Sequence, residues 1–426
     1  MDLFLKNIHL ISPLDKLDIK TDLCIKDGVI NGIGKIESES KTTNLINAED
    51  ITCVPGFFDM HVHFREPGQV HKEDMYSGSL SAVNGGFTGV LTMPNTIPPV
   101  DSKKVIEYIL NKERITTLDV YASSCLTKKR LGRELVDFKS MNKYGAAAFT
   151  DDGSVVQNPD LMNKAMEQLN ELGSIIAQHC EDIYLSGGGC MNKGTVSRKL
   201  NYKGIPNISE SSIIARDLMF LQSYRNLHYH IQHVSASDSI KLIRRAKEHL
   251  NNISCEVCPH HFILTDEDCL KYSTNAKMNP PLRTAKDVSE LKKALKGNVI
   301  DIISSDHAPH NENEKSVTFE QAPFGIVGLE SSIALSYTYL VKENVISFED
   351  LIYKMSINPR KLLGLEQNKI KVNEKANLTL LKTKETWTIN SNKFKSKSKN
   401  TPFDGFAVIC KPFAVINNNQ IYFSEL

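Results

Sequence analysis

The sequence lacks both a long apolar run and an excess of charge of either sign. Its 426 residues include 51 Lys and Arg against 50 Asp and Glu, a formal net charge of +1. That balance gives no electrostatic basis for binding nucleic acid or an anionic membrane surface. No apolar stretch approaches the roughly 20 residues that a membrane span needs, and Met1 to Asn7 lack the pattern of a secretory signal. We therefore expect a cytoplasmic protein that acts on small molecules, with no nucleic acid and no membrane as partner.

Cysteine is sparse, and no glycine-rich phosphate-binding motif is present. Nine scattered Cys residues argue against a disulfide framework and for reduced thiols. Cys255 and Cys258 form a C-x-x-C without a second pair at zinc-ribbon spacing, and it lies in a strand pattern, so we interpret it as structural. His260 and His261 would point to opposite sides of a strand, so we interpret them as structural too. No G-x-G-x-x-G follows a predicted strand, which argues against a dinucleotide-binding sheet.

The stretch from Val54 to Gly68 is the one around which the chain is organised. Its apolar lead-in predicts a buried strand, and His61 and His63 project from the same side of it because strand side chains alternate. Two imidazoles side by side can hold one metal ion. Arg65 follows as a fixed positive fork, and a Pro-Gly step then turns the chain out of the strand. Metal ligands, an anion clamp and a strand end therefore coincide within eight residues.

Short apolar strands alternate with helix-length segments beyond this stretch, and smaller alternating runs flank them at both ends of the chain. Repeated β-then-α units argue for a parallel sheet, so we predict a (β/α)8 TIM barrel over 54–364. The flanks, 1–53 and 365–426, are too small for separate cores, and we expect them to pair into one small β-sandwich domain. We interpret the Lys/Ser run at 393–399 as a solvated loop. Besides the opening strand and a tight turn at 26–30, we predict strands at 89–93, 146–150, 175–179, 229–233, 253–257 and 299–303, and helices at 209–224 and 236–250.

Polar residues follow the predicted strands repeatedly, as in a barrel whose site is assembled from the carboxyl ends of many strands. Four His and two Asp after five of these strands form the nitrogen and oxygen ligand set expected for two divalent ions, with zinc the first choice. A bridging carboxylate is available at Asp151-Asp152, and the residues alone leave open which Asp bridges. His233 is preferred over His228 and His230, because only His233 lies at the far end of its strand. The ligand candidates are His61, His63, Asp151 or Asp152, His179, His233 and Asp306.

Asp306 is the candidate that would have to contact both a metal and the reacting groups. A carboxylate that touches both a metal and the attacking water can pass a proton to a leaving nitrogen, so we predict that Asp306 is the acid–base residue. His307 and His310 are rivals for part of this work. The glycine-flanked segment 323–328 has two open interpretations, a mobile lid or a surface turn. The residues that offer a grip for carboxylate and amide groups are Arg65, Asn95, Asn279 and His310.

Ordered motifs run through almost the whole chain. They are His61–Gly68, Met93–Thr96, Thr150–Gly153, His179–Asp182, Lys277–Arg283, Asp306–His310 and Pro323–Gly328, followed by the tail segment Ser396–Phe403. Together they resemble class I bacterial dihydroorotases of the amidohydrolase superfamily. This many motifs in order are far more specific than any one of them alone.

The resemblance implies a zinc-dependent barrel that reversibly cyclises N-carbamoyl-L-aspartate to L-dihydroorotate in pyrimidine (UMP) biosynthesis. It implies two Zn2+ ions per chain, with one as the alternative, and it suggests a homodimer and aspartate transcarbamoylase as a partner enzyme. Matched residue by residue, His61 and His63 would hold one zinc, His179 and His233 the other, Asp152 would bridge them, and Asp306 would be both ligand and acid–base residue. The implied substrate contacts are His63, Arg65, Asn95, Asn279, His310, Phe324 and Gly325.

The absence of one lysine separates subfamilies. Many superfamily members bridge their metals with a carbamylated Lys on a strand, whereas 146–150 holds no Lys and Lys143 lies upstream. This agrees with Asp-bridged dihydroorotases and argues against hydantoinases and allantoinases, which usually use the modified Lys. The alternatives are another cyclic amidohydrolase of the allantoinase or hydantoinase type, and an inactive dihydroorotase-like scaffold that organises aspartate transcarbamoylase.

Overall fold

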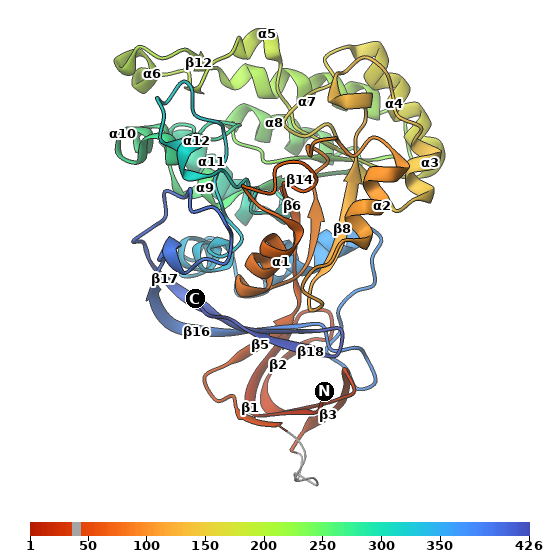
Figure 1. Ribbon diagram of the computed structural model, residues 1–426, viewed down its shortest axis with the longest axis vertical. Helices are drawn as coiled ribbons and strands as arrows, with labels where there is room; N and C mark the ends of the chain where they lie inside the picture. The colour runs from red at the N-terminus through yellow and green to blue at the C-terminus, as the bar shows by residue number, and fades with distance from the viewer. Residues whose placement is uncertain (36–43) are drawn as a thin grey trace.

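The computed structural model describes residues 1–35 and 44–426, which form a helix-covered barrel standing on a second sheet (Figure 1). The barrel sheet is parallel throughout, in the order β15-β14-β13-β10-β9-β8-β7-β6. The second sheet is mixed, in the order β18-β17-β16-β5-β1-β2-β3, with β4 paired to β1. The strands of the barrel are β6 (Phe57–Val62), β7 (Phe87–Thr92), β8 (Asp119–Ser124), β9 (Ala146–Phe149), β10 (Ile175–Gln178), β13 (His228–Ile231), β14 (Ile253–Val257) and β15 (Ile302–Ile303).

The two edges of the barrel sheet meet just beyond the ends of β6 and β15. Val62 and His307 form a parallel bridge, and the His63 N–H donates to the His307 carbonyl at 2.8 Å. The predicted barrel is thereby confirmed as a nearly closed ring of eight parallel strands. The strand β8 was not predicted, because polar residues at both of its ends shorten its apolar run to Val120 and Ala122.

Helices cover the outer face of the barrel (Figure 1). The predicted helices at 209–224 and 236–250 are observed as α7 (Asn207–Leu221) and α8 (Ser237–Lys247). Over the two described ranges, no helix combines the length and the apolar character needed to cross a membrane. The other helices are α1 (Met75–Asn84), α2 (Lys103–Asn111), α3 (Phe138–Lys143), α4 (Pro159–Leu172), α5 (Ile183–Ser186), α6 (Thr195–Leu200), α9 (Pro259–Ile263), α10 (Cys269–Tyr272), α11 (Ala285–Lys296), α12 (Glu312–Lys315), α13 (Ser332–Ser336), α14 (Phe348–Ile352) and α15 (Asn358–Leu362).

The two ends of the chain build the second sheet together, as predicted. β16 pairs antiparallel with β5, so that Leu380 lies opposite Cys53 and the C-terminal strands continue the N-terminal ones. The predicted tight turn joins β2 to β3, where Asp27 and Gly28 both have a positive φ, the conformation of a two-residue hairpin loop. Its strands are β1 (Leu3–Ser12), β2 (Leu17–Lys26), β3 (Val29–Gly34), β4 (Asn44–Asn47), β5 (Thr52–Pro55), β16 (Leu378–Thr388), β17 (Ala407–Asn417) and β18 (Gln420–Phe423).

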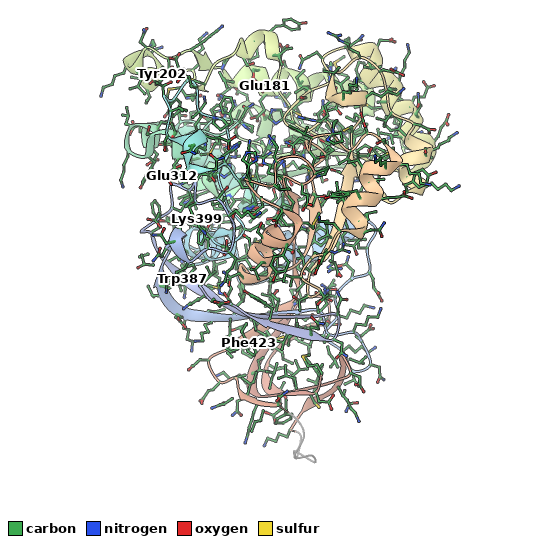
Figure 2. The ribbon with its side chains drawn as sticks, viewed as in Figure 1. Glu181, Tyr202, Glu312, Trp387, Lys399 and Phe423 are labelled. Carbon is green, nitrogen blue, oxygen red and sulfur yellow. The ribbon has the colours of Figure 1, made fainter. Side chains whose placement is uncertain are left out.

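The Lys/Ser run at 393–399 is not a solvated loop, so that interpretation was wrong. Ser396 and Ser398 are buried, and the segment lies between the terminal sheet and the barrel, where Figure 2 labels Lys399. The backbone N–H of Lys395 donates to the buried carboxylate of Glu330 at 2.6 Å, and the Ser396 hydroxyl donates to Glu73. The lysine side chains face outward, because Glu330 and Glu73 hold the backbone and Ser396, while the Ser398 hydroxyl donates to the Lys72 carbonyl at 2.8 Å.

The junction between the terminal sheet and the barrel gives a first test. Gly56 separates β5 from β6, and a Cβ there would clash with the hydrogen-bonded pair Thr88 Oγ1 and Asn377 Oδ1. We expect Gly56→Ala to lower the free energy of unfolding by about 1–3 kcal/mol, the usual cost of overpacking, as measured by urea denaturation. Gly194→Ala is the control, because its added Cβ would meet only side-chain atoms at 3.3 Å or more. Equal midpoints for Gly56→Ala and the parent chain would contradict this account of the junction.

Candidate metal centre

His61, on β6, and His63, directly after it, face two carboxylates at the carboxyl end of the barrel. His63 Nε2 lies 2.9 Å from Asp306 Oδ1 and 3.5 Å from Asp152 Oδ2. His61 Nε2 lies 3.4 Å from Asp152 Oδ1 and 3.5 Å from Asp306 Oδ1. Because the barrel closes beside Val62, the loop that carries Asp306 lies against both histidines.

Two further histidines complete the cluster from the neighbouring strands β10 and β13. His233 Nε2 lies 3.5 Å from Asp152 Oδ1, and His179 Nδ1 lies 3.9 Å from the same oxygen. His179 Nδ1 and His233 Nε2 are 2.9 Å apart. Asp152 therefore belongs to two compact groups of possible metal ligands, one with His61 and His63 and the other with His179 and His233.

The structure distinguishes the two neighbouring aspartates, which the sequence left open. The Asp151 carboxylate turns away from the histidines and accepts hydrogen bonds from the backbone N–H groups of Leu126 and Thr127, at 2.9 and 3.0 Å. Asp152 points among the imidazoles, and its Oδ1 forms no hydrogen bond with any residue that the structure describes. Asp151 therefore holds the loop, whereas Asp152 faces the position that lies between the two groups.

The donor set fits divalent cations. All six side chains are buried, and within the described residues His61 Nε2 and Asp152 Oδ1 make no hydrogen bond although neither is accessible to water. The two atoms lie 3.4 Å apart, and a cation held by both would satisfy them. Burial opposes ionisation, but the nearby imidazoles of His61 and His233 hold the pKa of Asp152 well below its ordinary value. His61 and His63 likewise depress the pKa of Asp306. Ionised carboxylates beside imidazole nitrogens are the ligands that zinc and similar ions take.

Two acidic residues that the sequence analysis missed orient the histidines. Glu256 on β14 faces His61 Nδ1 at 2.6 Å, and Glu181 faces His179 Nε2 at 3.2 Å. Figure 2 labels Glu181 at the end of the barrel remote from the terminal sheet. A carboxylate on one ring nitrogen fixes the tautomer and leaves the other nitrogen free for a metal. The available clue for Glu256 was an acidic residue inside an otherwise apolar strand.

A cavity of about 330 Å³ opens above the cluster and is lined by every predicted substrate contact. His63 Nδ1 faces Asn95 Oδ1 at 2.8 Å, and Asn279 donates to Glu181 at 2.7 Å. Arg65 donates to the Pro309 carbonyl at 3.3 Å, and burial lowers its pKa to about 10, so it stays charged at neutral pH. Among the lining residues are Arg65, Asn95, Asn279, His310, Phe324 and Gly325.

Three rival histidines lie outside the cluster. His307 turns away from the cavity, where its Nδ1 accepts from the Gly328 N–H at 3.2 Å. His228 and His230 both contact Ser254 Oγ, at 2.9 and 2.8 Å. His233 reaches the cluster from the loop after β13 with a positive φ of 32°, which supports the preference for the residue at the far end of the strand.

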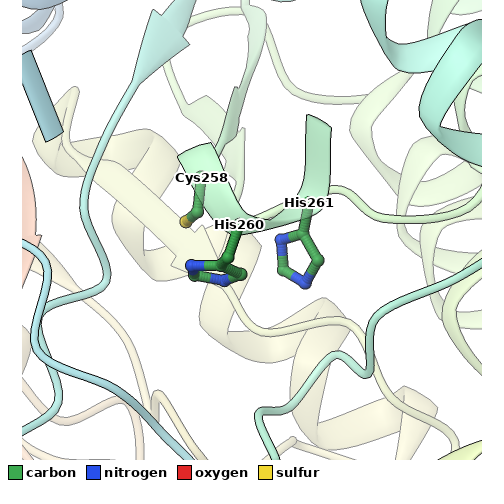
Figure 3. A group of neighbouring side chains, drawn as sticks. All are labelled: Cys258, His260 and His261. Carbon is green, nitrogen blue, oxygen red and sulfur yellow. The ribbon is translucent and has the colours of Figure 1, made fainter. Parts of the chain in front are cut away.

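His260 and His261 lie on the short helix α9 and not on a strand, so the reason for treating them as structural was wrong (Figure 3). Together with Cys258 they form a third compact group, with donor atoms within 4.8 Å of one another. His261 Nε2 donates to the Pro280 carbonyl at 2.9 Å, next to Asn279. That bond ties α9 to the loop of a predicted substrate contact, and a structural role for the pair stays our prediction.

Comparison with known proteins shows to which family the chain is similar. The family model "Dihydro-orotase-like" matches residues 51–239. The chain is 40% identical over 424 residues to a dihydroorotase of Acetivibrio thermocellus, with 99% of each chain covered. It is 42% identical over 422 residues to a dihydroorotase of Caldicellulosiruptor saccharolyticus, with 98% of each covered.

A solved structure shows the same fold at lower identity. The L-hydantoinase (dihydropyrimidinase) of Arthrobacter aurescens superimposes with a TM-score of 0.86 at 22% identity, covering 100% of this chain and 96% of that one. At that identity the match shows only that the two proteins share a fold. With about two residues in five shared over the whole length of its sequence relatives, the chain belongs to the dihydroorotase family of the amidohydrolase superfamily.

Proposed function

We propose that this protein is a zinc enzyme that reversibly cyclises N-carbamoyl-L-aspartate to L-dihydroorotate. Dihydroorotase activity follows from the full-length relatives. The observation that supports zinc at this site is the position of Asp152, whose carboxylate lies within both groups of buried imidazoles. A carboxylate shared in this way suits a pair of ions about 3.5–4 Å apart.

Under this proposal the side chains of the cluster hold metal, and Asp306 is both a metal ligand and the acid–base residue. His61 and His63 would hold one ion, His179 and His233 would hold the other, and Asp152 would be the ligand shared between them. When bound, such ions act as Lewis acids that polarise a carbonyl oxygen and lower the pKa of a water molecule. Two ions per chain match the two groups, with one ion as the alternative, and the homodimer and the partner aspartate transcarbamoylase stay predictions.

Asp306 is the residue that we propose for proton transfer. Its carboxylate lies beside His63 at 2.9 Å and also lines the cavity, so it faces both the metal ligands and the space for substrate. In the hydrolytic direction it takes a proton from the attacking water and delivers it to the ring nitrogen as the amide bond breaks; in cyclisation it works in reverse.

Part of the cavity lining suits a carboxylate. Arg65 contributes a buried guanidinium 3.4 Å from His310 Nε2, and Asn95 lines the same cavity. A planar guanidinium pairs with a carboxylate through two parallel hydrogen bonds, which orients the rest of the substrate toward the cluster. A hydantoin or allantoin lacks this carboxylate and would leave Arg65 buried without its ionic partner, so we favour dihydroorotate.

The two neighbouring aspartates provide a matched pair of variants. We expect Asp152→Asn to lower zinc affinity by more than the roughly 10–100-fold that loss of an outer hydrogen-bond partner costs, because it removes the shared ligand. Asp151→Asn should keep its zinc and lose only stability, since its carboxylate bonds to backbone N–H groups. Zinc content after dialysis against a graded chelator measures both, and equal zinc loss in the two variants would argue against Asp152 as the bridge.

Asp306→Asn tests the proton-transfer role. We expect kcat to fall by about 10²–10⁴-fold, the usual contribution of general acid–base catalysis, while the fold and most of the zinc are retained. Turnover of dihydroorotate is followed by ultraviolet absorbance, with zinc content measured on the same samples. A variant that turns over at the parent rate would refute this role for Asp306.

Arg65→Ala tests the carboxylate clamp. We expect KM for dihydroorotate to rise by about 10–100-fold, as loss of a charge-assisted hydrogen bond predicts, with a smaller change in kcat. Any turnover of 5,6-dihydrouracil, which lacks the carboxylate, should be unaffected. Arg133→Ala removes an exposed guanidinium and serves as the control. A normal KM for dihydroorotate in Arg65→Ala would show that the clamp lies elsewhere.

A further inference from the structure

Lys315 is a buried cation that none of the roles above uses. It ends α12, and its side chain is 6% exposed behind the outer wall of the cavity. Its Nζ donates to the backbone carbonyls of Pro323 at 2.8 Å and Thr274 at 3.0 Å, with the Lys277 carbonyl at 3.4 Å. The neighbouring carboxylate of Glu314 pairs instead with Lys72, at 2.8 Å. The Lys315 ammonium is therefore held by main-chain carbonyls from separate segments.

Those segments carry the outer substrate contacts. Pro323 directly precedes the Phe324-Gly325 turn, and Lys277 stands two residues before Asn279. The two segments also bond directly, since the Gly325 N–H donates to the Lys277 carbonyl at 2.9 Å. The position of Lys315 behind this pair means that its three N–H groups tie the turn, the Asn279 loop and Thr274 into one wall.

We propose that Lys315 is a positioning residue for substrate binding, which holds the Asn279 loop and the Phe324-Gly325 turn at the distance from Arg65 that an anionic substrate requires. This inference rests on the proposed function. It needs no contact between Lys315 and the substrate, because Lys315 is absent from the lining of the cavity. Its effect passes through the backbone of the wall.

Charge gives this wall a dependence on pH. Burial, and then the positive charges of Lys277 and Arg65, lower the pKa of Lys315 to about 7, while Glu314 opposes them. His310 is the third neighbouring basic group. Its burial, and then the positive charges of Arg65 and Lys315, lower its pKa, so it is neutral. Below pH 7 the ammonium offers three N–H groups and a full charge. Above pH 7 the neutral amine offers two N–H groups, so the wall is held less tightly as the pH rises. An anion bound beside Arg65 raises the pKa of Lys315 and so favours its charged form.

Lys315→Met and Lys315→Arg test the proposal by a split between KM and kcat. At pH 6 we expect Lys315→Met to raise KM for dihydroorotate about tenfold, the scale of lost charged hydrogen bonds, with kcat within about twofold, because no metal ligand is touched. The ratio of its KM to that of the parent should shrink between pH 6 and 8.5, as the parent loses its own charge. Lys315→Arg keeps the charge and should restore most of the binding at pH 6.

Lys271→Met is the matched control, because it removes an exposed ammonium near Thr274; its KM should equal that of the parent. If the parent chain does not turn over dihydroorotate, the proposed function fails. If the parent is active but Lys315→Met keeps the parent KM at pH 6, or loses kcat and zinc with KM unchanged, the role of Lys315 is overturned and the function stands. Should Lys315→Met not fold, Lys315→Arg decides: a KM ratio to the parent that stays constant from pH 6 to 8.5 also overturns it.

Discussion

The bridge between Val62 and His307 that closes the barrel is the contact on which the site depends. It places the residue before His307, Asp306, against His63, and it joins the first strand of the barrel to the last across some 240 residues of chain. Asp306 and His233 both adopt a positive φ, 47° and 32°. Such a backbone costs of order 1–3 kcal/mol for each residue other than glycine. The closed ring of strands offsets that cost, and the two side chains are thereby aimed at the common cavity.

The buried cluster is electrostatically suited to bind cations. The cluster brings imidazoles and carboxylates out of water at a single barrel mouth, and within residues 1–35 and 44–426 it leaves His61 Nε2 and Asp152 Oδ1, 3.4 Å apart, without a hydrogen bond. An unpaired buried polar atom costs about 1–3 kcal/mol, so ligand binding energy and folding energy are linked at this site. Glu256 and Glu181 lie outside the cluster and each contacts one ring nitrogen of a histidine, His61 and His179 respectively. The other nitrogen of each ring is thereby directed into the cluster.

The strand-end residues could be predicted from the sequence because a parallel barrel gathers all its carboxyl ends at one mouth. Strand periodicity selected His61, His63 and His233 as candidates, and the structure brings these side chains together around Asp152. What periodicity cannot supply is a partner far away in the chain. Glu256 was missed because its role depends on a contact with His61, 195 residues earlier in the chain. The run at 393–399 was misread because its lysines count as solvated charges, whereas its serines are buried and bond to Glu73 and to the Lys72 carbonyl, more than 300 residues away.

The C-terminal segment links the terminal sheet to the chemistry of the barrel. Asn400, directly after the misread run, uses its amide to donate to the Ala308 and Gly325 carbonyls at 3.3 and 3.1 Å, and it accepts from the His310 N–H at 3.1 Å. Two substrate-side segments are thus held by a residue from outside the barrel. Since a hydantoinase shares this fold at 22% identity, the barrel alone does not determine the substrate. The predicted substrate contacts lie on loops at its mouth, and Asn400 bonds to two of those loops.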